Sequence, residues 1–159
     1  VVRLLRAFGC RILVNDPYIQ LDPEDAAAGV ELVSFDRVIA ESDVVTMHPR
    51  VTEETTGMMN AAAFTAMKQG ALFVNTARGP LVDYDDLTEA LKTGPLGSAM
   101  LETFAVEPVP EDWELLKLPN VTLTPHIAGA SVRTVTFAAE QAAEEVRRFL
   151  AGEPPRNPC

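Results

Sequence analysis

The feature that most constrains this chain is the alternation of short apolar runs with longer stretches of helical periodicity. The runs predicted as strands are 11–15, 31–33, 43–47, 71–75, 96–101 and 121–124. The stretches predicted as helices are 24–28, 34–41, 61–68, 83–92 and 131–151. This spacing predicts an α/β fold with a doubly wound parallel sheet covered by helices on both faces. Several of the strands are apolar throughout, as burial on both faces of a sheet requires.

The two ends of the sequence carry signals of their own. The chain opens without an initiating Met on a segment that reads as the middle of a helix, ended by Gly9, so we expect a fragment. The last helix repeats apolar residues every three or four positions, which predicts one buried stripe. Its members are Val132, Val135, Ala139, Ala142, Val146 and Phe149. Residues 1–152 are expected to form one domain, and the proline-rich residues 153–159 a linker.

Composition excludes several classes of function. The 159 residues include 13 Lys and Arg against 23 Asp and Glu, so the net charge is −10. This balance argues against nucleic acid or an anionic membrane as a partner. No apolar run approaches the roughly 18 residues that span a bilayer, and no leader is recognisable. Two cysteines and two histidines suggest neither a disulfide framework nor a metal site, so a cytoplasmic location is expected. Cys10 is predicted to be a small core residue.

Polar residues fall at the predicted carboxyl ends of the strands, where open α/β sheets bind ligands. They are Asp16, His48, Thr76, Arg78, Glu102 and His126, with Ala77 between Thr76 and Arg78 and with Glu107 in the loop after the fifth strand. Both histidines and an arginine are therefore expected to converge on one edge of the sheet. The stretch 105–119 between them is rich in Pro and acidic residues and is predicted to be an ordered surface loop.

Asp16 has two interpretations. An acid at the end of the second strand of a dinucleotide fold accepts hydrogen bonds from the ribose hydroxyls and favours NAD over NADP. Alternatively, Asp16 opens a turn before Pro17. A G-x-G-x-x-G fingerprint is absent, because none of the nine glycines lies two residues from another. The acid normally follows that loop by about 20 residues, which would place the loop before Val1.

Three further residues carry candidate chemistry. Arg78 in a tight turn offers two parallel donors for a carboxylate or carbonyl oxygen, and it is otherwise a solvated loop residue. His126 is a candidate general acid, although a lone loop histidine is often structural. Glu107 by itself reads as an ordinary loop residue, whereas its carboxylate paired with His126 would fix the tautomer of the imidazole and raise the pKa of His126. His48 is expected to shape a cofactor pocket rather than perform chemistry.

These residues lie in segments that resemble the NAD-binding domain of the D-isomer-specific 2-hydroxyacid dehydrogenases. The matching segments are 8–17, 43–57, 75–83, 101–108 and 118–126, in the family's order and spacing. The resemblance implies a Rossmann domain, and hydride transfer between NAD and C2 of a D-2-hydroxy acid or 2-oxo acid. It implies Arg78 as the substrate-binding residue, His126 as acid/base and Glu107 as its partner. The implied NAD contacts are Asp16, Pro17, His48, Pro49, Thr76, Ala77, Arg78, Glu102, His126, Ala128 and Gly129.

The sequence differs from the family's pattern at two positions and covers only part of the family's structure. Glu102 stands where the family usually has Asp, and Arg50 where it commonly has Pro. The family is also expected to form a homodimer, and its second, substrate-binding domain is absent from this sequence. The first strand and its Gly-rich loop are absent too, so a slot one strand wide is expected in the middle of the sheet. We therefore expect this chain alone to bind NAD poorly and to be inactive.

Two other classes of protein share parts of this pattern. The C-terminal-binding-protein corepressors have the same domain and use NAD to control assembly, but the acidic balance and the lack of a nuclear-type basic run count against them. A Rossmann methyltransferase also places an acid after its second strand. Arg78, Glu107 and His126 would have no role there.

Overall fold

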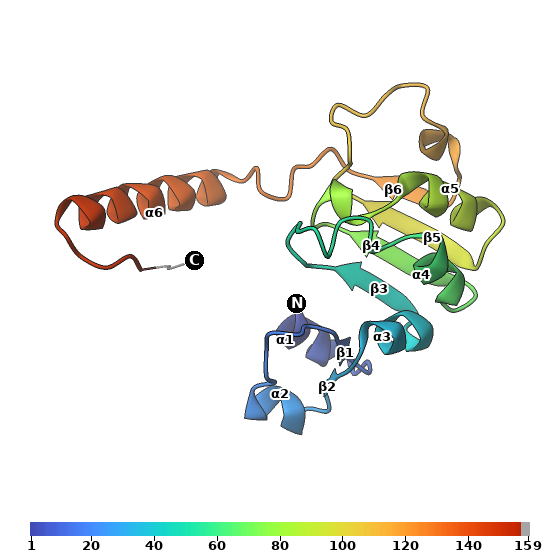
Figure 1. Cartoon of the computed structure of the whole chain (residues 1–159), viewed down its shortest axis with the longest axis horizontal. Coiled ribbons are helices and arrows are strands. Elements are labelled where there is room, and N and C mark those ends of the chain that lie inside the picture. Colours follow the sequence, from blue (N-terminus) through green and yellow to red (C-terminus); the bar gives the residue numbers. More distant parts are fainter. Residues whose placement is uncertain (157–159) are drawn as a thin grey trace. The chain divides into compact units, whose positions relative to one another are not determined.

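The computed structural model describes residues 1–156, so the end of the expected linker, Cys159 included, lies outside the described residues. The chain divides into two units, Val1–Leu123 and Thr124–Cys159. The first contains every strand, and the second contains one long helix (Figure 1). The boundary predicted from the sequence at residue 152 separates a domain from a linker, whereas the boundary after Leu123 separates two compact units. The predicted boundary therefore stays a prediction.

Six parallel strands of the first unit form two separate sheets. The strands are β1 (Leu13–Val14), β2 (Glu31–Leu32), β3 (Val44–Met47), β4 (Ala71–Asn75), β5 (Leu96–Leu101) and β6 (Val121–Leu123). β1 pairs with β2, and the other four form a sheet in the order β3-β4-β5-β6. No ladder joins β1 to β3 within the described residues. The pair β2-β1 corresponds to strands 3-2 of the order 3-2-1-4-5-6, and β3 to β6 correspond to strands 4-5-6 extended by one further strand. The doubly wound class is therefore confirmed, and the place of strand 1 is unfilled within the described residues.

The helices connect these strands as the alternation predicts. The bounds are α1 (Val2–Leu5), η1 (Arg6–Phe8), α2 (Pro23–Ala27), α3 (Phe35–Glu41), α4 (Ala61–Ala66), η2 (Gly79–Leu81), α5 (Tyr84–Lys92), η3 (Glu114–Lys117) and α6 (Val132–Leu150). Local capping explains several starts, since Ser34 accepts from Arg37 N and Asp83 accepts from the amides of Asp85 and Asp86.

The core of the first unit lies between the four-stranded sheet and helices α4 and α5. Phe64 of α4 meets Phe73 of β4 edge to face at 5.4 Å between ring centroids, and both are almost fully buried. Leu81, Leu87 and Leu101 are completely buried around them. Buried and half-buried residues alternate along β4, so one face of this strand is buried and the other is partly exposed. This core fixes the strand ends that carry the candidate site.

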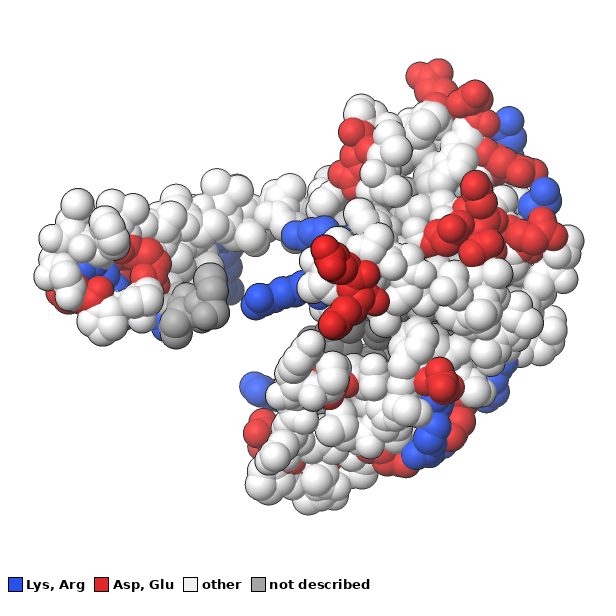
Figure 2. Space-filling view, viewed as in Figure 1, with Lys and Arg blue, Asp and Glu red and all other residues white. Residues whose placement is uncertain are grey.

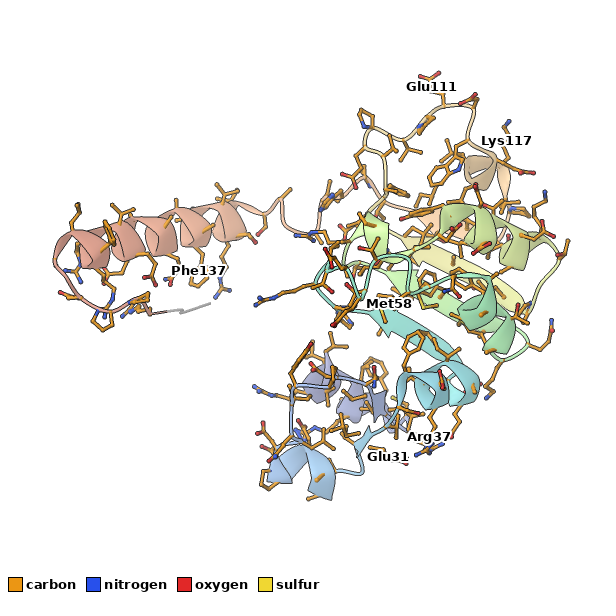
Figure 3. All side chains as sticks on the ribbon, in the orientation of Figure 1. Glu31, Arg37, Met58, Glu111, Lys117 and Phe137 are labelled. Atoms are coloured by element: carbon orange, nitrogen blue, oxygen red, sulfur yellow. The ribbon has the colours of Figure 1, made fainter. Side chains whose placement is uncertain are left out.

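The two-stranded sheet is smaller than the sequence predicted. The expected strand 11–15 is paired over Leu13–Val14 alone, because β1 has a partner on one side only. Surface ion pairs hold this sheet to α3: Arg11 Nη1 lies 3.0 Å from Glu41 Oε2, and Arg37 Nη2 lies 3.6 Å from Glu31 Oε2. Figure 3 shows Glu31 and Arg37 side by side at this corner.

Two expectations about burial are wrong. Cys10 is exposed and not a core residue, because neighbouring apolar side chains such as Phe8 are themselves 81% exposed. The stripe along α6 is not buried either: no residue of the helix is buried, and Phe149 is 81% exposed. Phe137, labelled in Figure 3, is also exposed. Spacing places apolar residues on one face of a helix, but it does not supply the surface that covers the face.

Candidate active site and cofactor site

The carboxyl ends of β3 and β4 frame a cavity of about 460 Å³. Residues from the two loops that follow these strands line it: His48, Pro49, Arg50, Val51, Thr76, Ala77 and Arg78. The strands pair in parallel, with Met47 opposite Asn75, so both loops leave the sheet at the same edge. The predicted convergence of His48 and Arg78 is therefore observed. The cavity volume lies within the range of small-molecule sites.

A buried asparagine shapes the turn that carries Arg78. Asn75 is fully buried at the end of β4, where its Nδ2 donates to Arg78 O at 3.0 Å and its Oδ1 accepts from Ala77 N at 3.0 Å. Asn75 O also accepts from Glu102 N, which links the turn to the end of β5. These bonds close the backbone between Thr76 and Arg78, so the exposed Arg78 side chain projects from a defined turn.

Gly79 lets this turn pack directly on the loop after β5. A Cβ at this position would lie 2.0 Å from the carbonyl carbon of Phe104 and 2.3 Å from Ala105 N. Only glycine permits so close an approach of two backbones. The approach joins the Arg78 turn to the loop that carries Glu107.

Asn75 and Gly79 lie inside the motif 75–83, which predicts no role for either of them. For Asn75 the available signal was a polar residue ending an otherwise apolar strand.

The acids after β5 have different surroundings. Glu102 is 4% exposed at the end of the strand. Glu107 is exposed, and its Oε1 accepts from Phe104 N at 2.8 Å, which ties the loop back on itself. The segment 105–119 is predicted to be an ordered surface loop, but it contains the short helix η3 and the fully buried Leu115, so part of it packs into the core. The proposed contacts of Glu102 and Glu107 with cofactor and with His126 stay predictions.

His48 lies against the end of β3 in a partly desolvated position. Its Nε2 is 3.2 Å from Thr46 Oγ1. Burial, with a smaller effect of the chain's N-terminal ammonium, lowers the pKa of His48 below its usual value. The ring is therefore neutral near pH 7, which suits a residue that lines a pocket.

Asp16 makes the turn that one of its two interpretations predicts, and the contact with a ribose stays a prediction. It follows β1, and its Oδ1 accepts from Tyr18 N at 2.9 Å, which makes the turn predicted before Pro17. This bond occupies one carboxylate oxygen of a half-buried side chain. The carboxylate can still accept further hydrogen bonds, and the two neighbouring hydroxyls of a ribose are suitable donors for them.

The second unit begins with the segment that carries His126. His126 has a φ of 50°, in the left-handed region that non-glycine residues rarely adopt, and its amide donates to Thr124 O at 3.0 Å. Ala128 and Gly129 follow it and are exposed. Ser131 then caps α6 by accepting from Thr134 N at 3.1 Å. The left-handed backbone conformation of His126 costs about 1–3 kcal/mol, and such conformations are common at functional positions.

The parallel order, the strand-end cavity and the acid after β1 define a dinucleotide-binding α/β domain. Comparison with known proteins identifies it further: residues 1–128 match the family described as D-isomer specific 2-hydroxyacid dehydrogenase, NAD binding domain. The chain belongs to this family, and the predicted cofactor class, NAD, is confirmed at that level. In the described part of the chain, no helix is long and apolar enough to cross a membrane.

Curated relatives and solved structures agree with this assignment. The chain is 43% identical to a glyoxylate reductase of Korarchaeum cryptofilum over 99% of its residues, which is 47% of that protein. It is 38% identical to a D-3-phosphoglycerate dehydrogenase of Archaeoglobus fulgidus, covering 30% of that protein. The holo form of Rhodotorula graminis D-mandelate dehydrogenase superposes with a TM-score of 0.90 at 33% identity, over 99% of this chain and 46% of that one. The chain thus spans less than half the length of these relatives.

Proposed function

We propose that this chain is the cofactor-binding part of an NAD-dependent oxidoreductase that interconverts D-2-hydroxy acids and 2-oxo acids. The observation that carries the proposal is the exposed Arg78 guanidinium on a cavity at the strand ends of an NAD-binding fold. Reductases of glyoxylate and dehydrogenases of D-3-phosphoglycerate among its relatives support this reaction class. A homodimer and a second, substrate-binding domain belong to the same proposal.

In the proposed reaction, Arg78 binds the substrate carboxylate and orients the keto group. When bound, NAD would supply the hydride-transfer chemistry at C2 of the substrate. His126 donates a proton to the keto oxygen during reduction and removes it during oxidation, and Glu107 holds the imidazole in its protonated form. A positioned acid of this kind contributes about 10²–10⁴-fold in rate. The His126 and Glu107 roles rest on the sequence motifs.

The cofactor contacts belong to the proposal as well. Asp16 binds the adenosine ribose hydroxyls, which disfavours a 2′-phosphate and selects NAD over NADP. His48, Pro49, Thr76 and Ala77 line the cavity as a neutral wall. Pro17, Glu102, Ala128 and Gly129 complete the set implied by the family motifs.

Replacing Arg78 tests the substrate role. In the protein that includes the substrate domain, Arg78→Gln is expected to lower kcat/KM for 2-oxo acids by about 10²–10³, because a fixed donor to developing negative charge is lost. Arg78→Lys should restore only part of the loss, since lysine lacks the parallel donors. Affinity for NADH, measured by fluorescence titration, should change little. Near-normal turnover by Arg78→Gln would contradict the assignment.

Replacing His126 separates binding from chemistry. His126→Ala is expected to abolish most turnover while NADH still binds, because the residue acts on the proton rather than on the cofactor's affinity. An enzyme that keeps its turnover without this imidazole would refute the acid/base role.

The chain by itself is expected to be inactive and to bind NADH weakly. Within the described residues no ladder joins the two sheets, so the facing edges of β1 and β3 lack strand partners, whereas a dinucleotide fold binds its cofactor across the middle of one continuous sheet. Titration of the 159-residue chain with NADH checks this. Micromolar affinity would show that the divided sheet suffices.

A further inference from the structure

Arg50 places a second guanidinium on the cavity that Arg78 lines. It comes from the loop after β3, whereas Arg78 comes from the turn after β4, so the two cations approach one volume from different elements. Both side chains are exposed. The resembled family commonly has Pro at the position of Arg50, so this charge distinguishes the chain within its class.

No ion pair with an acidic residue holds either of the two cavity arginines, Arg50 and Arg78, in the described part of the chain. Most other arginines of the described chain are held in ion pairs: Arg6, Arg11, Arg37, Arg147 and Arg148. Within the described residues, no ion pair joins Arg50 or Arg78 to an Asp or Glu, although the whole chain carries a net charge of −10. Figure 2 shows acidic side chains gathered over α5 and η3, and a further acidic group beside basic side chains near the middle of the view. An uncompensated pair of cations in so acidic a protein marks a place for an anion.

The remaining wall of the cavity adds no charge. His48 is partly desolvated, which favours its neutral form, and the other lining residues are Pro49, Val51, Thr76 and Ala77. The cavity therefore presents two positive charges to its ligand. A monocarboxylate neutralises one of them, and a ligand with two anionic groups neutralises both.

The diphosphate of a dinucleotide is a weaker explanation for the second charge. In doubly wound folds it binds at the glycine-rich turn after the first strand and at the N-terminus of the following helix. The cavity lies at the ends of β3 and β4 instead, and Arg50 shares it with the residue assigned to the substrate carboxylate.

We propose that Arg50 selects substrates, namely 2-oxo acids that carry a second anionic group, a carboxylate or a phosphate, close to the first. This inference rests on the proposed function, because it takes Arg78 as the group that binds the first carboxylate. Arg50 binds the second anion, so the pair distinguishes dianionic from monoanionic acids that are otherwise alike.

A binding experiment without cofactor tests the site independently of turnover. The full chain is titrated by calorimetry at constant ionic strength with malonate, phosphonoacetate and acetate. Malonate or phosphonoacetate should bind more tightly than acetate, and Arg50→Gln should reduce that difference by about tenfold or more. If Arg50→Gln weakens the binding of malonate more, Arg50 prefers a carboxylate as the second anionic group. If it weakens the binding of phosphonoacetate more, Arg50 prefers a phosphate-like group. The proposal would be overturned if Arg50→Gln bound malonate as tightly as the unchanged chain does, and bound phosphonoacetate as tightly as well.

Matched variants separate a local effect from net charge. Lys117→Gln removes one positive charge on η3, away from the cavity-lining residues, and should leave the preference for dianions unchanged. Arg50→Lys should restore part of the preference, because it restores the charge without the fork of donors. A loss of the same size in Lys117→Gln would mean that overall charge, not Arg50, sets the preference.

Kinetics distinguish a failure of this inference from a failure of the proposed function. In the protein with its substrate domain, kcat/KM is compared for pyruvate and oxaloacetate, and for hydroxypyruvate and its phosphate ester. Arg50→Gln should shrink the advantage of the dianion in at least one pair by about tenfold. Unchanged ratios with a raised KM for NADH would reassign Arg50 to the cofactor and overturn the inference. No turnover of any acid, with Arg50-dependent malonate binding intact, would refute the dehydrogenase reaction while supporting the anion site.

Discussion

The side chain of Asn75 is expected to be the strongest single support of the Arg78 turn. It is fully buried and makes two hydrogen bonds to the backbone, one to Ala77 N and one to Arg78 O. Each such bond contributes a net of about 0.5–1.5 kcal/mol, and the vacated volume adds to the loss. Asn75→Ala should therefore lower the free energy of unfolding by about 2–4 kcal/mol.

Asn60 provides a matched control for this prediction. Its side chain also makes two hydrogen bonds to the backbone, accepting from the amides of Ala62 and Ala63, but it caps α4 at an exposed position. Loss of an exposed N-cap costs about 1 kcal/mol. The two variants thus remove the same residue type and similar bonds, and they differ mainly in burial.

A charged replacement sharpens the test. Asn75→Asp keeps the acceptor for Ala77 N but, when ionised, has no donor for Arg78 O. It should be less stable than the unchanged protein at pH 7, and the difference should narrow as the pH falls, because a protonated carboxyl regains a donor. Asn60→Asp, at an exposed cap, should show little of this dependence.

Urea unfolding measures all of these variants. Trp113 is the only tryptophan, and its ring lies 5.1 Å from that of Tyr84, so its fluorescence reports on the unit that contains Asn75. Circular dichroism should give the same midpoint if the transition is two-state. A loss in Asn75→Ala no larger than that in Asn60→Ala would refute the reasoning.

Two further predictions follow from the same site. Gly79→Ala should cost about 1–3 kcal/mol or more in urea unfolding, because its Cβ would lie 2.0 Å from the Phe104 backbone, whereas Gly129→Ala, with no atom within 4 Å, should be near neutral. Equal stability of these two variants would contradict the close approach. Burial lowers the pKa of His48 below its usual value of 6.5. The fold therefore keeps the full contribution of the neutral ring to its stability above pH 6.5 and loses this contribution as the pH falls through the lowered pKa of His48. His48→Gln should lose part of the acid sensitivity between pH 7 and 5, and unfolding curves with unchanged pH dependence would exclude this effect.

The sequence by itself determined the class of fold and the order of its elements. Apolar runs of strand length alternating with helical periods allow few arrangements, and the ends of β4 and β5 fell at the predicted residues. The caps at Ser34 and Asp83 were equally predictable, because a side chain and an amide three residues away meet within one turn. The grouping of His48 with Arg78 followed from the rule that parallel strands end at a common edge.

Tertiary structure decided what depends on partners distant in sequence. The short β1, the exposure of Cys10 and the uncovered stripe of α6 all follow from surfaces that neighbouring elements provide or do not provide. The role of Asn75 depends on a turn closed in three dimensions, and that of Gly79 on a backbone 25 residues away. Local sequence encodes which face of an element is apolar, but only the packed chain determines what that face meets.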